Sequence, residues 1–112
     1  MEPLDWGSLR ENCAGDEGLV HEVLDLFRKE ADSLLNDVRT AVAAKDALQV
    51  KRTAHRLKGA LVSLAARPSV EAAKALELAG ANSESAVYEP YFARLETGMA
   101  RLMKVVAMPS AA

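Results

Sequence analysis

Apolar residues recur at alternating steps of three and four along most of this chain, and that spacing limits the fold more than any other feature. Such steps place side chains on one face of an α-helix, whereas a half-buried strand alternates every second residue. A long helix is therefore predicted from Asp16 onward, with an inward face of Val20, Leu24, Phe27, Ala31, Leu34, Val38 and Ala41. A second helix is predicted to begin near Ala47, with an inward face of Ala47, Val50, Ala54, Leu57, Leu61 and Leu64.

Polar residues and a proline mark where these helices begin and end. Asp16 can cap the first long helix, and Glu17 suits the positive end of the helix dipole. Asp46, followed three residues later by Gln49, has the pattern of a capping box and starts the second helix. Pro68 would break a continuing helix but is favourable in the first turn of the next one.

Two more long helices and one short helix complete the prediction. A helix is expected over residues 69–79, with Val70, Ala73 and Leu76 inward, followed by a C-cap and loop at residues 80–83. The last helix should start close to Pro90, and its apolar series is Tyr88, Phe92, Leu95, Met99, Leu102 and Val106. A short helix is expected over residues 4–12. The predicted fold is therefore all-α: an antiparallel four-helix bundle with a short extra N-terminal helix.

The composition suits one small domain with an aliphatic core. Half of the 112 residues are apolar but only 4% are aromatic, so Leu, Val and Ala must fill the interior. We expect a single domain over residues 1–112, with an ordered core at about residues 4–107 and a frayed tail at residues 108–112.

Several classes of protein are disfavoured by the same sequence. The formal net charge of -2, and the lack of aromatic residues among the basic ones, argue against nucleic-acid binding. No apolar run could span a bilayer, no signal peptide is evident, and Cys13 is the single cysteine. We therefore expect a cytoplasmic monomer. No metal or cofactor is expected, because the two histidines lack a Glu-x-x-His pattern. No nucleotide-binding loop is present, so ATP-dependent kinase activity is not expected.

His55 is the residue with the most unusual surroundings. It follows the inward Ala54, and a rotation of about 100° per residue turns it toward solvent. Its neighbours at three and four residues are Lys51, Arg52, Lys58 and Gly59. Nearby cations favour the neutral imidazole that a nucleophile requires, and they would also stabilise a phosphoryl group on the ring.

Gly59 is the second unusual feature of this helix. Glycine in a helix interior costs roughly 1 kcal/mol relative to alanine. Helical side chains lean toward the N-terminus, so any side chain at position 59 would cover the turn that holds His55. We expect Gly59 to keep that surface bare for a functional reason.

The segment His55-Arg56-Leu57-Lys58-Gly59 resembles the signature of histidine phosphotransfer (HPt) domains of two-component phosphorelays. The resemblance implies that His55 accepts a phosphoryl group from the aspartate of a receiver domain and passes it to another receiver. It also implies that Lys58 helps to neutralise the phosphoryl group and that Gly59 leaves room for the partner. The chain departs from the family at Ala65, where many members have glycine.

The predicted partner-binding residues surround this motif: Lys51, Arg52, Arg56 and Val62. The basic residues, with Lys58, would attract the acidic pocket of a receiver domain, although an ordinary solvated helix face has the same composition. A non-phosphorylated interaction module that binds a signalling partner through this face is the alternative function.

Two other features of the first long helix have simpler explanations. His21 follows Glu17 by one turn, which favours a surface ion pair rather than a second phosphorylation site. Leu19, Val23 and Leu26 form an extra apolar strip, which either packs against the N-terminal segment or is exposed for a partner.

Overall fold

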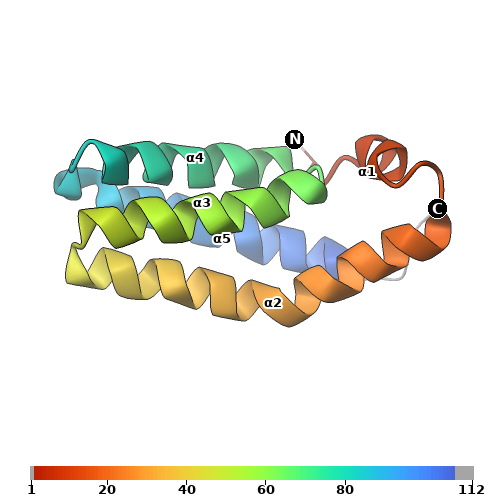
Figure 1. Ribbon diagram of the computed structural model, residues 1–112, viewed down its shortest axis with the longest axis horizontal. Helices are drawn as coiled ribbons and strands as arrows, with labels where there is room; N and C mark the ends of the chain where they lie inside the picture. The colour runs from red at the N-terminus through yellow and green to blue at the C-terminus, as the bar shows by residue number, and fades with distance from the viewer. Residues whose placement is uncertain (1, 108–112) are drawn as a thin grey trace.

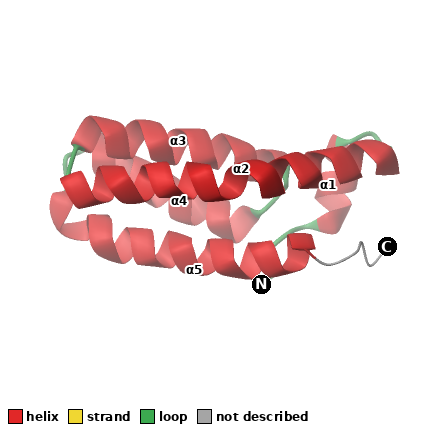
Figure 2. Cartoon of the chain, turned by 90° about the horizontal axis from the view of Figure 1, so that it is seen from below, coloured by secondary structure: helices red, strands yellow, loops and turns green. Residues whose placement is uncertain are grey.

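The computed structural model describes residues 2–107, and its helices confirm the all-α prediction. Their bounds are α1 Trp6–Asn12, α2 Glu17–Ala44, α3 Ala47–Ser63, α4 Arg67–Ala81, the 3₁₀-helix η1 Ser85–Val87, and α5 Tyr88–Ala107. Helices α2 to α5 lie side by side with alternating directions, and α1 lies at one end of the bundle (Figures 1 and 2). No strand occurs within residues 2–107. The predicted frayed tail, residues 108–112, lies outside the described residues.

The predicted apolar faces form the core. In α2 every predicted inward residue is buried except Leu34, which is partly buried and packs against the others. Of the predicted inward residues of the second long helix, Ala47 is partly buried and the five from Val50 to Leu64 are buried. All six of α5 are also buried. Each aliphatic side chain removed from water contributes about 1.5–3 kcal/mol to the free energy of folding, so burial of these apolar faces is the main term that stabilises the bundle.

The predicted helix starts are confirmed by their capping contacts. Asp16 Oδ1 accepts a hydrogen bond from the backbone N–H of Leu19 at 3.1 Å, and Asp46 Oδ1 accepts one from Gln49 N–H at 3.2 Å. The Gln49 side chain makes no return bond within residues 2–107, so only half of the predicted capping box forms. Pro68 lies in the first turn of α4, as predicted.

The predicted end of α4 before Gly80 is wrong, because the helix continues to Ala81. Gly80 is buried where α4 crosses α3. A Cβ atom on Gly80 would lie 2.6 Å from the backbone nitrogen of Lys51 and 3.0 Å from the carbonyl oxygen of Ala47. Glycine is therefore needed here for close contact between two helices and not for a turn. This contact also sets the register of α4 along α3.

Ala65 occupies a backbone conformation that favours glycine, with φ of 57°. The N–H of Ala65 donates to the Val62 carbonyl at 3.0 Å and that of Ala66 to the Leu61 carbonyl at 3.1 Å, the pattern of a Schellman helix end. A left-handed alanine costs on the order of 1 kcal/mol. Ala65 thus adopts the left-handed conformation that glycine favours.

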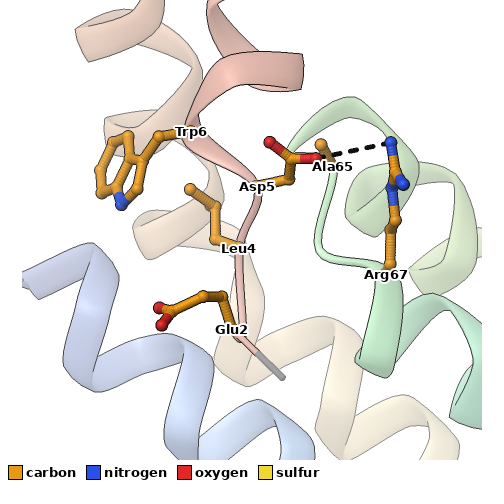
Figure 3. Close-up of a pocket in the computed structure, with 6 residues that line it drawn as sticks. All are labelled: Glu2, Leu4, Asp5, Trp6, Ala65 and Arg67. Atoms are coloured by element: carbon orange, nitrogen blue, oxygen red, sulfur yellow. Dashed lines mark ion pairs between the residues drawn. The ribbon is translucent and has the colours of Figure 1, made fainter.

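The N-terminal segment contacts the turn between α3 and α4 that contains Ala65. The N–H of Asp5 donates to the Ala65 carbonyl at 3.1 Å, and the Asp5 carboxylate lies 3.5 Å from Arg67 Nη2. Leu4, Trp6 and Glu2 complete a pocket between the segment and the turn (Figure 3). These contacts attach α1 to the end of the bundle where α3 passes into α4.

Candidate functional site

His55 projects from α3 into solvent, with 67% of its side chain exposed, while its neighbours Ala54 and Leu57 are fully buried. This orientation follows from the helical phase, as the sequence predicted. The ring is therefore open to a large partner.

Glu77 is the contact of His55 that the sequence analysis missed. This residue projects from α4, and its Oε2 lies 2.9 Å from His55 Nδ1. Only 17% of its side chain is exposed, so a largely buried carboxylate contacts an exposed ring. The two residues are 22 positions apart, and the only sequence signal is a glutamate directly after the core residue Leu76.

Lys58 contacts the other oxygen of the same carboxylate, with Nζ 2.7 Å from Glu77 Oε1. The contact has the distance of an ion pair but not the angles of a hydrogen bond, and Oε1 has no hydrogen-bond partner within residues 2–107. Lys58 was expected beside His55 itself. The lysine and the histidine contact the two oxygens of one shared carboxylate.

The charges around Glu77 keep it ionised. Burial by itself raises the pKa of Glu77, but the Lys58 ammonium and the His55 ring outweigh burial and hold that pKa below its ordinary value. A carboxylate can only accept hydrogen bonds, so we assign the ring hydrogen of neutral His55 to Nδ1. The lone pair is then on Nε2, which forms no hydrogen bond within the described part of the chain. A ring in this tautomer can act as a nucleophile through Nε2.

Gly59 lies on the open surface one turn beyond His55. A Cβ atom added to Gly59 would meet nothing within 4 Å. No core contact explains this glycine, in contrast to Gly80.

The predicted partner residues are all exposed on α3. Lys51 and Arg52 are exposed and form no ion pair within residues 2–107. Arg56 instead approaches α2, with Nη1 3.9 Å from Asp37 Oδ2. Val62 is exposed seven residues beyond His55, on the same helix face.

Leu48 was also missed by the sequence analysis. It is exposed seven residues before His55, so apolar side chains flank the ring two turns away on either side. The seven-residue spacing of Leu48, His55 and Val62 was the available signal.

The expected ion pair of His21 with Glu17 is wrong, because Glu17 pairs with Arg10 of α1 at 3.0 Å. The extra apolar strip is partly exposed and partly buried. Leu19 and Leu26 are exposed, whereas Val23 packs against the core. Val23 and Leu26 line a groove between α2 and α3 that also includes Ala60.

Within residues 2–107, no cluster of three His, Cys, Asp or Glu side chains could hold a metal ion. In the same part of the chain, no helix is long and apolar enough to cross a membrane.

Comparison with known proteins agrees with this geometry. The family model for the Hpt domain matches residues 22–104. The structure is similar to the crystal structure of histidine-containing phosphotransfer protein B (HptB) from Pseudomonas aeruginosa, with a TM-score of 0.85 and 23% identity over 93% of this chain and 90% of that one. A search of curated proteins finds no match. Because the family model covers most of the bundle, the chain belongs to the Hpt domain family, the histidine phosphotransfer domains of phosphorelays.

Proposed function

We propose that His55 is the phosphorylated residue, which accepts a phosphoryl group from the aspartyl-phosphate of one receiver domain and passes it to another. The observation that carries this proposal is the exposed ring whose Nδ1 contacts the largely buried carboxylate of Glu77. That contact leaves Nε2 available and orients it away from the bundle, as attack on a bulky partner requires.

The transfer needs a nucleophile, a leaving group and balanced charge. The Nε2 lone pair of His55 forms a bond to phosphorus while the bond from phosphorus to the aspartyl oxygen breaks. Such a step depends mainly on positioning and electrostatic stabilisation. Lys58 contacts the same carboxylate as His55 and would offset part of the negative charge of the phosphoryl group.

The surface around His55 is suited to a receiver domain. Gly59 leaves space beside the ring, and Leu48 and Val62 offer apolar contact on either side of it. Lys51 and Arg52 add positive charge toward an acidic receiver pocket, which should make association faster at low salt. Arg56 is a weaker candidate because it is directed toward Asp37.

Incubation with a phosphorylated receiver domain tests the proposal. The chain should acquire acid-labile, alkali-stable phosphate, and ATP alone should not label it. His55→Gln should abolish the label, while the matched control His21→Gln should retain it, because His21 is exposed on α2 and has no carboxylate partner within residues 2–107.

Label that persists in His55→Gln would contradict the proposal. A stable complex with the receiver that never becomes labelled would instead support the interaction-module alternative.

A further inference from the structure

We propose that the ion pair between Asp37 and Arg56 is a strap across the groove between α2 and α3, and that it opens when a receiver domain docks on His55. On opening, Arg56 exchanges Asp37 for an acidic group of the receiver. The inference rests on the proposed function. It assigns to Asp37 of α2 the role of competing with the receiver for Arg56.

The groove between α2 and α3 runs along the helix that carries His55, and this pair divides it. The hollow nearer the α3–α4 turn has a volume of about 410 Å³, and the hollow nearer the α2–α3 turn has one of about 310 Å³. Asp37 and Arg56 line both hollows, so the pair lies between them. The first hollow shares Glu30 and Ala60 with the apolar groove of Val23 and Leu26. Movement of Arg56 away from Asp37 would therefore join the hollows into one groove.

The ion pair is weak enough to be exchanged. Arg56 Nη1 lies 3.9 Å from Asp37 Oδ2, which is longer than a hydrogen bond. The two side chains are 66% and 48% exposed, so water and salt screen their attraction. Within residues 2–107, Arg56 pairs with no other carboxylate. A receiver carboxylate that excludes water on docking would attract the guanidinium more strongly than Asp37 does.

The position of Arg56 allows the exchange. It follows His55 directly and lies about 100° around α3 from it, between the ring and α2. Rotation about its side-chain bonds can direct the guanidinium either toward α2 or toward the face that carries His55. A guanidinium binds a carboxylate best through paired hydrogen bonds, and the contact with Asp37 is too long to supply them.

The strap would select partners by charge. A receiver with a carboxylate opposite Arg56 gains both the guanidinium and the joined groove. A partner without that carboxylate leaves Arg56 beside Asp37 and meets a divided groove. Such a difference favours the acidic partner without a contact to the phosphoryl group.

Association kinetics test the opening of the strap. The probe is the receiver domain that phosphorylates the wild-type chain, and its association rate is measured at about 0.05 M and about 0.5 M NaCl. Asp37→Asn releases Arg56 and should speed association about twofold to fivefold at low salt and less at high salt. In the Arg56→Gln background the same substitution should have a smaller effect, because no guanidinium remains to be released. The thermal midpoints should be nearly equal, because both residues are exposed.

Glu30→Gln is the matched control for the change in charge. Glu30 is an exposed glutamate of the same groove, and its substitution removes the same charge without touching the strap. It should change the association rate by the same factor with and without Arg56→Gln. If Asp37→Asn also acts by the same factor in both backgrounds, the proposal is overturned, and labelling of His55 by the receiver would leave the proposed function standing.

NMR of the free chain tests the closed strap without a receiver. Asp37→Asn should shift the side-chain Nε–Hε resonance of Arg56 and leave that of Arg52 in place, whereas Glu30→Gln should shift neither. An Arg56 resonance that does not respond to Asp37→Asn would also overturn the proposal. If no receiver phosphorylates the wild-type chain, the proposed function fails and the opening of the strap fails with it, and the NMR shift would then support the closed contact alone.

Discussion

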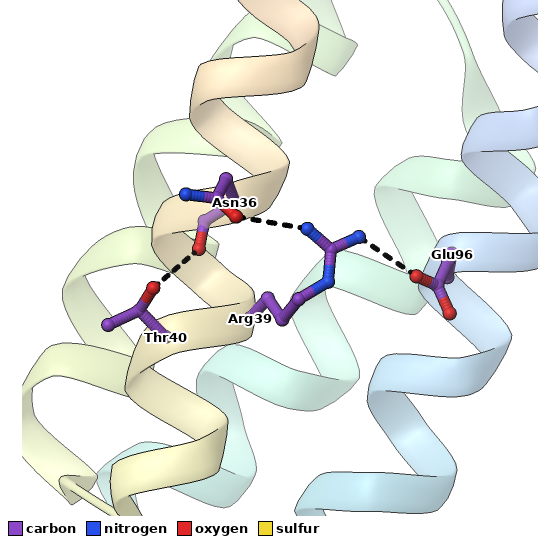
Figure 4. A network of polar contacts seen from close by, with 4 residues as sticks. All are labelled: Asn36, Arg39, Thr40 and Glu96. Carbon is purple, nitrogen blue, oxygen red and sulfur yellow. Dashed lines mark hydrogen bonds and ion pairs between the residues drawn. The ribbon is translucent and has the colours of Figure 1, made fainter.

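Two pairs of helices in this bundle are each linked by a polar cluster that includes one glutamate, and the two glutamates differ in burial. Between α2 and α5, Arg39 donates to Glu96 at 3.0 Å and to Asn36 at 3.1 Å (Figure 4). Thr40 bonds the Asn36 carbonyl, and the Arg39 guanidinium also lies over the ring of Phe92. Between α3 and α4, Glu77 joins His55 and Lys58.

The difference lies in what each carboxylate would lose without its partners. Glu96 is 49% exposed, so water can replace Arg39, and such a surface pair contributes about 0–1 kcal/mol. Glu77 is 17% exposed, and its buried oxygen depends on Lys58. A buried carboxylate therefore orients the groups around it, whereas an exposed one merely contacts them.

Replacement of the cation in each cluster, Lys58 or Arg39, should show the largest difference between the two clusters. Lys58→Ala should slow phosphoryl transfer about ten- to a hundredfold, because one charge-assisted contact is worth about 1.5–3 kcal/mol. Arg39→Ala should leave the transfer rate unchanged. Single-turnover kinetics with a phosphorylated receiver measures both, and equal rates in the two variants would show that the buried cluster has no special role.

The tight α3–α4 contact should be sensitive to one methyl group. Gly80→Ala would place Cβ 2.6 Å from a backbone nitrogen, which cannot move without shifting α3. We expect a loss of about 1–3 kcal/mol in the free energy of unfolding, measured by urea denaturation. An unchanged stability would mean that the two helices separate easily, and the restraint on Glu77 would then be weaker than this contact implies.

An alanine at Gly59 should change the stability in the opposite direction to an alanine at Gly80. Gly59→Ala should stabilise the domain by up to about 1 kcal/mol, because helix propensity improves and no contact is disturbed. Gly59→Gln should fold as well as the wild type but slow transfer, since its side chain would lean over His55. Thermal midpoints and transfer rates should be measured together. A Gln variant that transfers at the wild-type rate would show that the receiver does not approach over this turn.

The smallest effect is expected at the α3–α4 turn. Ala65→Gly should raise the stability by about 0.5 kcal/mol, because relief of a left-handed alanine exceeds the added flexibility of the unfolded chain. Transfer should be unaffected. Lower stability on denaturation would indicate that the buried methyl group of Ala65 outweighs the backbone strain.

Local properties of the sequence account for most of the fold. These properties are the spacing of apolar residues, the N-caps at Asp16 and Asp46, and the proline at position 68. Each depends on residues at most four positions apart, so each can be recognised without knowledge of the contacts between helices. The same holds for the exposure of His55 and the bare surface at Gly59, which depend only on their phase within α3.

Contacts between helices required the tertiary structure. Glu77 reaches His55 because of the register and rotation of α4 against α3, and the close approach at Gly80 sets that register. The packing of neighbouring elements also decides that Arg56 approaches Asp37 and that Glu17 pairs with Arg10 instead of His21. Apolar periodicity says which face of a helix is buried but not which neighbour it meets. The sequence alone therefore determined the fold class and the exposure of His55, and only packing decided which carboxylate contacts that histidine.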